Sequence, residues 1–159
     1  MLLWLLKLKA GINVSSKSKK NLEFSQMEKN LFKVVKCTEQ YWEFVRTLRN
    51  DSRVSNGFIQ KHTISEQEQV KYMNKNSDNY RIAIFNSKPA GYFGVIEEDI
   101  RVCTHPDYQR KGLGKFMLKE LLKIWPNSVA RIKIHNEASI KLFESAGFET
   151  SFIIMEQPK

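Results

Sequence analysis

The sequence has few of the residues that build disulfide frameworks, metal centres and membrane spans. It contains two cysteines, Cys37 and Cys103, and three histidines among 159 residues. Two distant thiols form no disulfide framework and are typical of a reducing compartment, so we expect a cytoplasmic protein. The dispersed histidines have no metal-ligand spacing, which predicts no metal. No apolar run approaches the roughly 20 residues that cross a bilayer, and we expect no membrane partner.

Positive charge is in excess, but much of it lies at the start of the chain. The formal net charge is +9, and residues 1–29, with six lysines and two glutamates, account for +4 of it. The remainder suits a polyanionic small molecule as well as a nucleic-acid backbone. A nucleic-acid binder has only charge in its favour, because the sequence has no recognisable reading helix or aromatic RNA-binding signature. We therefore expect no nucleic-acid partner.

The length predicts one domain, which we place at residues 30–159, after an N-terminal extension at residues 1–29. Residues 1–9, MLLWLLKLK, are apolar, but their lysines follow the apolar residues, which is the reverse of a secretory signal. An extra strand, a membrane anchor, a misassigned start and an oligomer contact, including a homodimer, stay open for this segment. Residues 15–20, SSKSKK, have the composition of a solvated linker.

The rest of the chain alternates between strand and helix patterns. Thr38 is expected to cap the first helix, and Ser65 and Glu68 have the spacing of a capping box for the second, with Val70 and Met73 on its buried side. Trp125 and Pro126 end the third helix, whose apolar stripe is Leu113, Met117, Leu121 and Ile124. Asn136 begins the last, and Gly147 ends it. Strands are expected at residues 31–36, 80–85, 90–96, 100–104, 129–134 and 148–155.

This order, β-α-α-β-β-β-α-β-α-β, predicts an α/β (α+β) fold with helices on the faces of the sheet. The three strands between residues 80 and 104 have short connections and should form an antiparallel meander.

Residues 102–115, VCTHPDYQRKGLGK, combine a strand, a glycine-containing turn and a helix start. The first N–H groups of a helix are free, and its dipole attracts anions. Gly112 and Gly114 have no Cβ, so an anion could approach the backbone there. Arg110, Lys111 and Lys115 add positive charge. Residues 109–114 are therefore a candidate pyrophosphate site.

Two segments resemble the signatures of the GNAT superfamily of N-acetyltransferases. In residues 102–122, VCTHPDYQRKGLGKFMLKELL, the residues Gln109, Gly112 and Gly114 match the acetyl-CoA signature. Residues 136–148, NEASIKLFESAGF, are similar to the second, an Asn followed by a helix that closes with Glu-x-x-Gly-Phe. The resemblance implies a mixed, mostly antiparallel sheet with splayed central strands. It also implies direct attack of a primary amine on acetyl-CoA in a ternary complex, without an acyl-enzyme.

The resemblance further implies which residues bind acetyl-CoA. The strand at residues 102–104 would pair with the pantetheine arm and polarise the thioester carbonyl. The backbone of residues 109–114 would hold the pyrophosphate, and Asn136 would lie beside the cofactor arm. The implied cofactor-binding residues are Val102, Cys103, Thr104, Gln109, Arg110, Lys111, Gly112, Leu113, Gly114, Lys115, Asn136 and Phe143.

The resemblance places Glu98 where some members keep a catalytic glutamate, which would deprotonate the amine. The alternatives are a solvated turn of Glu97, Glu98 and Asp99, or a neighbouring acid as the base. Many members protonate the departing thiolate with a tyrosine, but this chain has Phe143 there. Ser139, Cys103 or solvent are the remaining proton donors.

The same residues permit other interpretations of the function. A noncatalytic acyl-CoA-binding or regulatory module is the alternative that Phe143 favours. For an enzyme, the acceptor would be a small-molecule amine, such as an amino sugar, or a protein N-terminus. His105 and His135 are expected to be loop or capping residues, and Arg101 is expected to pair with Asp99.

Overall fold

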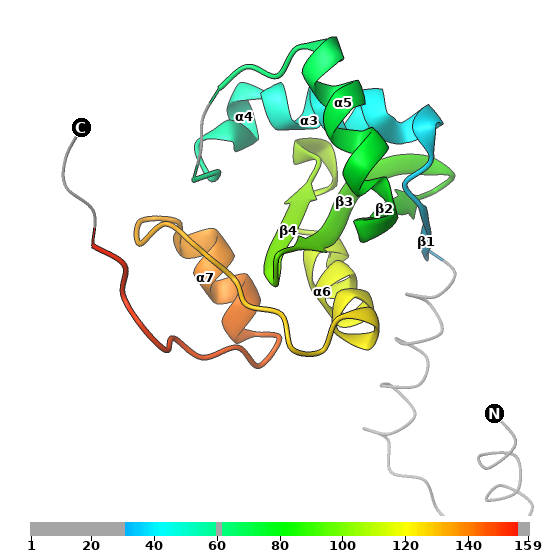
Figure 1. Cartoon of the computed structure of the whole chain (residues 1–159). Helices are drawn as coiled ribbons and strands as arrows, with labels where there is room; N and C mark the ends of the chain where they lie inside the picture. Colours follow the sequence, from blue (N-terminus) through cyan, green and yellow to red (C-terminus); the bar gives the residue numbers. More distant parts are fainter. Residues whose placement is uncertain (1–30, 60–61, 156–159) are drawn as a thin grey trace, which may run out of the picture. The chain divides into compact units, whose positions relative to one another are not determined.

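The computed structural model describes residues 31–59 and 62–155, so the expectations for residues 1–29 lie outside the described residues. Its centre is a four-stranded antiparallel sheet with the order β1-β2-β3-β4 (Figure 1). The strands are β1 (Phe32–Lys36), β2 (Tyr80–Phe85), β3 (Lys88–Ile96) and β4 (Asp99–Thr104). The predicted meander is confirmed, and the first predicted strand joins it through β2.

Two tight turns set the register of the meander. Asn86 and Ser87 connect β2 to β3 with φ of 48° and 64°, and Glu97 and Glu98 connect β3 to β4 with φ of 50° and 64°. Paired left-handed residues form the hairpin turn whose twist matches that of the flanking strands. Phe85 therefore pairs with Lys88, and Ile96 with Asp99.

Helices α3 (Trp42–Asn50) and α5 (Glu66–Asn76) cover one face of the sheet, with α4 (Ser52–Ser55) between them in the chain (Figure 1). Val45, Leu48 and Met73 pack there in one core cluster with residues of β2, β3 and β4. The predicted capping box at Ser65 is confirmed.

Two details of this face correct the sequence-based expectations. Thr38 makes no side-chain capping bond, because a short 3-10 helix, Glu39–Tyr41, precedes α3. Val70 is 48% exposed instead of buried, and the neighbouring Gln69 is buried in its place. The Gln69 side chain donates a hydrogen bond to the Trp42 carbonyl across the α3–α5 interface (2.9 Å), which satisfies a polar group inside the core.

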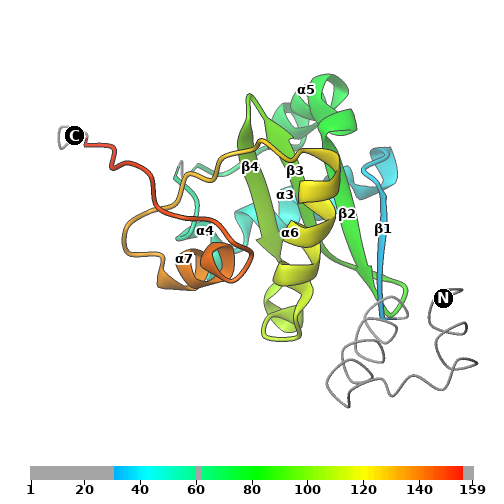
Figure 2. The ribbon, with the colours of Figure 1, turned by 90° about the horizontal axis from the view of Figure 1, so that it is seen from below.

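Helix α6 (Leu113–Ile124) crosses the opposite face of the sheet (Figure 2). Leu113, Met117 and Leu121 are fully buried, as the periodicity predicts, whereas Ile124 at the helix end is exposed. The helix packs closely over β3, because a Cβ on Gly91 would meet the Met117 sulfur at 3.0 Å and the Cys103 carbonyl oxygen at 2.7 Å. Helices thus lie on both faces, as expected.

Helix α7 (Glu137–Glu144) lies beyond the β4 edge and contacts α6 (Figures 1 and 2). Asn136 caps it by accepting a hydrogen bond from the Ser139 backbone (3.2 Å), and Gly147 follows it with φ of 91°. Both predicted ends of this helix are confirmed.

The last two predicted strands are not formed in the described residues. Residues 129–134 make a single parallel bridge, Asp99 to Val129, and residues 148–155 have no regular secondary structure. Phe152, Ile153, Ile154 and Met155 are 61% to 92% exposed. Their apolar pattern is that of a strand, but a strand also needs a neighbouring strand for its backbone, and no described strand pairs with this segment.

Candidate functional site

The outer edge of β4 separates from the chain that follows α6. The Ile100 N–H donates to the Val129 carbonyl (2.8 Å) and the Val129 N–H donates to the Glu98 carbonyl (2.9 Å). Beyond this bridge residues 129–134 turn away from β4 (Figure 2). The two segments therefore form a V whose closed end is at Glu98 to Ile100.

The backbone of Val102 and Thr104 faces the open side of this V. The Ile100 N–H points to Val129, whereas the His105 N–H points inward to the Ala90 carbonyl on β3 (2.8 Å). Because backbone groups alternate along a strand, the N–H and carbonyl groups of Val102 and Thr104 point outward with those of Ile100. No strand in the described part of the chain pairs with them on that side. This edge can pair with an extended amide-containing ligand.

The N-terminus of α6 begins nine residues after Thr104. The first helical hydrogen bond runs from the Phe116 N–H to the Gly112 carbonyl (3.0 Å), so the N–H groups of Leu113, Gly114 and Lys115 have no acceptor within the helix. Gly112 has φ of 81°, and a Cβ built on it would have no atom within 4 Å. The helix end therefore faces open space, as an anion site requires.

Gly114 has a different role from the one expected. A Cβ there would lie 3.1 and 3.2 Å from the two Leu142 methyl groups of α7, and 3.7 Å from the Thr104 hydroxyl. The missing side chain allows α7 to pack against the start of α6. The expectation that an anion approaches Gly114 through its missing Cβ is not supported by this geometry, and Gly112 is the open position.

The side chains around this loop are partly engaged already. Lys111 lies over the rings of Phe85 and Tyr108, with its Nζ 5.5 and 5.3 Å from their centroids. The Gln109 side chain donates to the Thr104 carbonyl (3.4 Å), which ties the loop to the end of β4. Arg110 has φ of 60°, and its strained backbone turns the chain toward the helix.

Asn136 lies where α7 meets the segment after α4. Its Oδ1 accepts from the Ser139 backbone, and its Nδ2 lies 3.0 Å from the position of a Cβ on Gly57. Lys133 donates to the Asn56 carbonyl nearby (3.3 Å). The structure therefore brings Asn136 to a contact with Gly57, 79 residues earlier in the chain, which no local pattern predicts.

Cys103 and Phe143 are buried, so their side chains are not presented to an open site. Cys103 lies in the core cluster with Cys37 and Tyr92, on the α3 side of the sheet. Burial raises the pKa of the Cys103 thiol to about 12 and that of Cys37 to about 11. Phe143 packs edge-to-face on Phe148, with ring centroids 5.1 Å apart.

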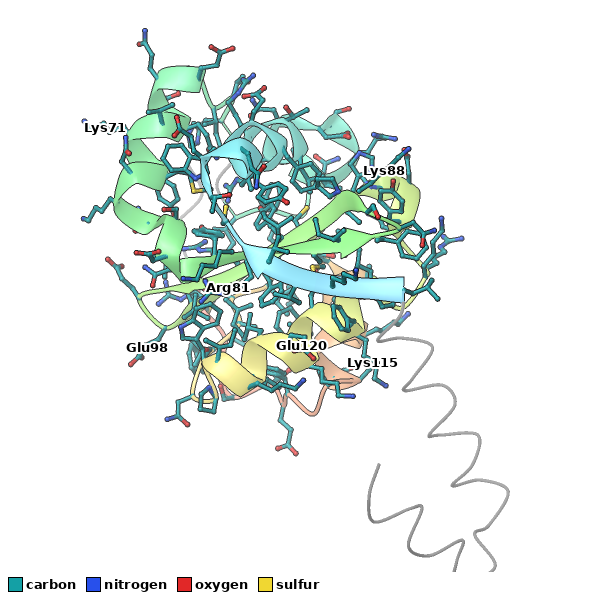
Figure 3. The ribbon with its side chains drawn as sticks, turned by 90° about the vertical axis from the view of Figure 1, so that its right-hand side faces the viewer. Lys71, Arg81, Lys88, Glu98, Lys115 and Glu120 are labelled. Carbon is teal, nitrogen blue, oxygen red and sulfur yellow. The ribbon has the colours of Figure 1, made fainter. Side chains whose placement is uncertain are left out.

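Glu98 lies in the exposed turn at the closed end of the V, with its backbone carbonyl bound to Val129. In Figure 3 its side chain points outward at one end of α6, whereas Lys115 lies at the other end. The structure therefore does not bring Glu98 and the glycine loop together; they lie at opposite ends of β4. Ser139 is half-buried on the first turn of α7.

The polar residues beside the site behave as the sequence predicts. Arg101 pairs with Asp99 (3.1 Å), and the ring of His105 accepts from the Asp107 N–H (3.3 Å) as a capping residue. His135 lies exposed in the turn before α7. Within residues 31–59 and 62–155, no group of three or more His, Cys, Asp or Glu side chains can hold a metal ion. No helix of this described part is long and apolar enough to cross a membrane.

A set of polar contacts beside the glycine loop was not predicted from the sequence. Asp51 caps α4 by accepting from the Arg53 backbone (2.9 Å) and also accepts from its guanidinium, so these hydrogen bonds lower the Asp51 pKa to about 2. Arg53 also reaches Asp107, three residues after Thr104 (3.2 Å). The pair ties α4 to the entrance of the glycine loop across 54 residues, a contact that only folding creates.

Comparison with known families identifies the domain type. Residues 76–150, from the end of α5 to just beyond α7, match the family model described as an acetyltransferase (GNAT) domain. No curated protein matches the chain.

Solved structures share the fold. A spermidine N-acetyltransferase from Vibrio cholerae, in complex with CoA and spermine, superposes with a TM-score of 0.70 at 17% identity, over 80% of this chain and 86% of that one. A putative acetyltransferase from Salmonella typhimurium with its cofactor acetyl-CoA gives 0.65 at 20% identity, over 77% and 82%. A ribosomal-protein-alanine N-acetyltransferase from Brucella melitensis gives 0.64 at 18% identity, over 74% and 84%.

Proposed function

Because the chain belongs to the GNAT superfamily of acetyltransferases, we propose that residues 30–159 transfer an acetyl group from acetyl-CoA to a primary amine in the cytoplasm. The observation that carries this proposal is the juxtaposition of the open β4 edge with the free N-terminus of α6. The β4 edge offers backbone hydrogen bonds to an extended ligand, and the N-terminus of α6 offers an anion site. Together they match the two chemical parts of acetyl-CoA, its pantetheine amides and its pyrophosphate.

For the pyrophosphate, we assign the backbone of Gln109, Arg110, Lys111, Gly112, Leu113, Gly114 and Lys115. The three free N–H groups of Leu113, Gly114 and Lys115 supply hydrogen bonds, and the helix dipole adds a favourable field. Gly112 leaves the approach open. The positive charge of Lys115 attracts the pyrophosphate over a longer range. The residues present therefore fit a diphosphate.

For the pantetheine arm, we assign the outer backbone of Val102 and Thr104, with Cys103 between them contributing only to the strand. Asn136 caps α7 just after residues 129–134, which form the other arm of the V, and Phe143 is a buried residue of that helix. An N–H of this edge would also donate to the thioester oxygen as negative charge develops there, which is electrostatic catalysis of the oxyanion type.

Direct attack requires a neutral amine, and Glu98 is our proposal for the group that removes its proton. Glu98 lies at the closed end of the V, and water can relay the proton to its exposed carboxylate. Glu97 provides a matched control, because it occupies the same exposed turn with a similar left-handed backbone. Glu98→Gln should lower kcat and flatten its dependence on pH, whereas Glu97→Gln should leave both unchanged. Equal profiles for the two variants would remove Glu98 from this role.

The departing thiolate has no tyrosine to protonate it. Ser139 is the proposed donor, since its side chain is one turn before Phe143 and on the half-buried surface of α7. The alternative is solvent, because a thiol with a pKa of about 8.5 is a good leaving group near neutral pH. Ser139→Ala should lower kcat at high pH if Ser139 donates, and Ser145→Ala on the same helix is the control. An unchanged rate for Ser139→Ala would favour solvent.

A noncatalytic acyl-CoA-binding or regulatory module is the second candidate, and it is favoured by Phe143, which has no hydroxyl to protonate the thiolate. Release of free CoA from acetyl-CoA, measured over a panel of amines, separates the two functions. The panel includes spermine, an aminoglycoside and a peptide with a free N-terminus, which are amines of the kinds named in the descriptions of similar solved structures, and it adds an amino sugar. Amine-dependent release supports the enzyme. Binding of acetyl-CoA without release over any amine would support the module instead.

A further inference from the structure

A small cavity between α3 and α5 contains a guanidinium without a carboxylate partner. The cavity has a volume of about 180 Å³, and Arg49, His62, Tyr72 and Tyr80 are among its lining residues. The hydroxyls of two of these lining residues, Tyr72 and Tyr80, form a hydrogen bond with each other (2.9 Å). Polar groups therefore line a space large enough for a small ligand group.

The carboxylates closest to Arg49 have other partners. Glu68, which also lines the cavity, accepts from the Ser65 backbone and hydroxyl (2.8 and 2.7 Å), and Asp51, two residues after Arg49, is bound by Arg53. Arg46, one turn earlier on α3, pairs with Glu43.

Arg49, in contrast, has no carboxylate within 4 Å in the part of the chain that the structure describes. Its Nε is buried without a hydrogen-bond partner, and its guanidinium lies 4.5 Å from the centroid of the Phe58 ring. A partly desolvated guanidinium without a counter-charge is costly, and a bound anion would offset that cost.

Arg49 also lies near the strand that we assign to acetyl-CoA. Leu48, the residue before Arg49 on α3, packs in one core cluster with Tyr92 on β3 and Cys103 on β4. Burial raises the pKa of both of these side chains, and Arg49 opposes both rises through its charge and, at Tyr92, also through a hydrogen bond. Cys103 stands between Val102 and Thr104, whose backbone forms the open edge. An acceptor bound at Arg49 therefore lies across β4 from the helix end that we assign to the pyrophosphate.

We propose that Arg49 is the anion-binding residue of the acceptor site and that the acceptor amine carries a carboxylate or a phosphate. The inference rests on the proposed function, because it concerns the amine of that reaction. Arg49 offers a planar fork of donors that suits both groups, and the stacked Phe58 ring holds the fork in place. The acetyl-CoA site on the other side of β4 does not depend on Arg49.

The test compares amines that differ only in charge, at saturating acetyl-CoA. One pair is glucosamine 6-phosphate and glucosamine, and the other is β-alanine and β-alaninamide. In the wild type, kcat/KM should be about 10- to 100-fold higher for the charged member of at least one pair. The pair that shows the preference identifies the anion as phosphate or carboxylate. Equal values within both pairs, or a preference for the neutral members, would overturn the proposal.

Variants assign the preference to one residue. Arg49→Met should abolish the preference while leaving the Kd for acetyl-CoA unchanged, and Arg46→Met, from the same helix, should keep it. Arg49→Lys keeps a charge but not the fork, so it should show an intermediate preference and also serves if Arg49→Met does not fold. Retention of the full preference by both Arg49 variants would overturn the role of Arg49. Failure of acetyl-CoA to bind the wild type would instead count against the proposed function.

Discussion

The contact between Gly114 and Leu142 gives a quantitative test of how the glycine loop is built. Replacing a helical Gly with Ala stabilises a helix by up to about 1 kcal/mol. Here the new Cβ would lie 3.1 and 3.2 Å from the Leu142 methyl groups, closer than an ordinary contact. Overpacking of this kind typically costs about 1 to 3 kcal/mol. We therefore expect Gly114→Ala to lower the free energy of unfolding by about 1 kcal/mol.

The sign should reverse when Leu142 is shortened. In the Leu142→Ala background the added Cβ has space, so Gly114→Ala should stabilise by up to about 1 kcal/mol, which gives a coupling energy of about 2 kcal/mol in a double-mutant cycle. Urea denaturation of the four proteins measures this coupling. Additive effects would refute the assignment of Gly114 to helix packing. The double variant should also keep its affinity for acetyl-CoA. If the double variant regains stability but does not bind acetyl-CoA, the ligand itself needs a glycine at position 114.

Three further predictions concern the scaffold. Gly94→Ala should destabilise by about 2 to 4 kcal/mol in urea denaturation, because its Cβ would lie 2.2 Å from the Asn79 carbonyl oxygen; a loss below about 1 kcal/mol would contradict this packing. Ser65→Ala should cost about 1 kcal/mol through the lost cap, and an unchanged midpoint would contradict that role. Cys37 and Cys103 should resist iodoacetamide at pH 8 until the protein unfolds, and rapid labelling of the native protein would contradict their burial. Because the pKa values of both thiols are raised in the folded state, the free energy of unfolding should fall as the pH rises above about 9.

The sequence predicts the first four strands and the four main helices because their signals are local. Each strand of the meander combines apolar residues with a short turn, and α5 and α7 carry recognisable caps at Ser65 and Asn136. The pattern failed for residues 129–134 and 148–155, whose composition is equally strand-like. A strand forms only with a partner, and pairing is a property of the fold that the composition of one segment does not contain.

The candidate site was predictable in part for the same reason. The turn and helix start at Gly112 follow from adjacent residues, and the structure has a left-handed glycine there. The role of Gly114 depends on its contact with Leu142. The role of Arg49 depends on nearby carboxylates being bound to other groups. Both relations exist only in the folded chain. Even a local error has a tertiary cause: Gln69 is buried in place of Val70 because the Trp42 carbonyl accepts its hydrogen bond.

The most direct test of the central claim is a calorimetric titration of acetyl-CoA into the wild type and two variants of Gly112. Asn and Asp both tolerate the left-handed backbone and have nearly the same shape, so Gly112→Asn controls for strain and bulk while Gly112→Asp adds a charge. A carboxylate about 5 Å from a phosphate costs about 1 to 3 kcal/mol, depending on solvent exposure. We predict that the wild type binds one acetyl-CoA and that Gly112→Asp binds about 5- to 150-fold more weakly than Gly112→Asn. No binding by the wild type, or equal affinities of the two variants, would contradict the account.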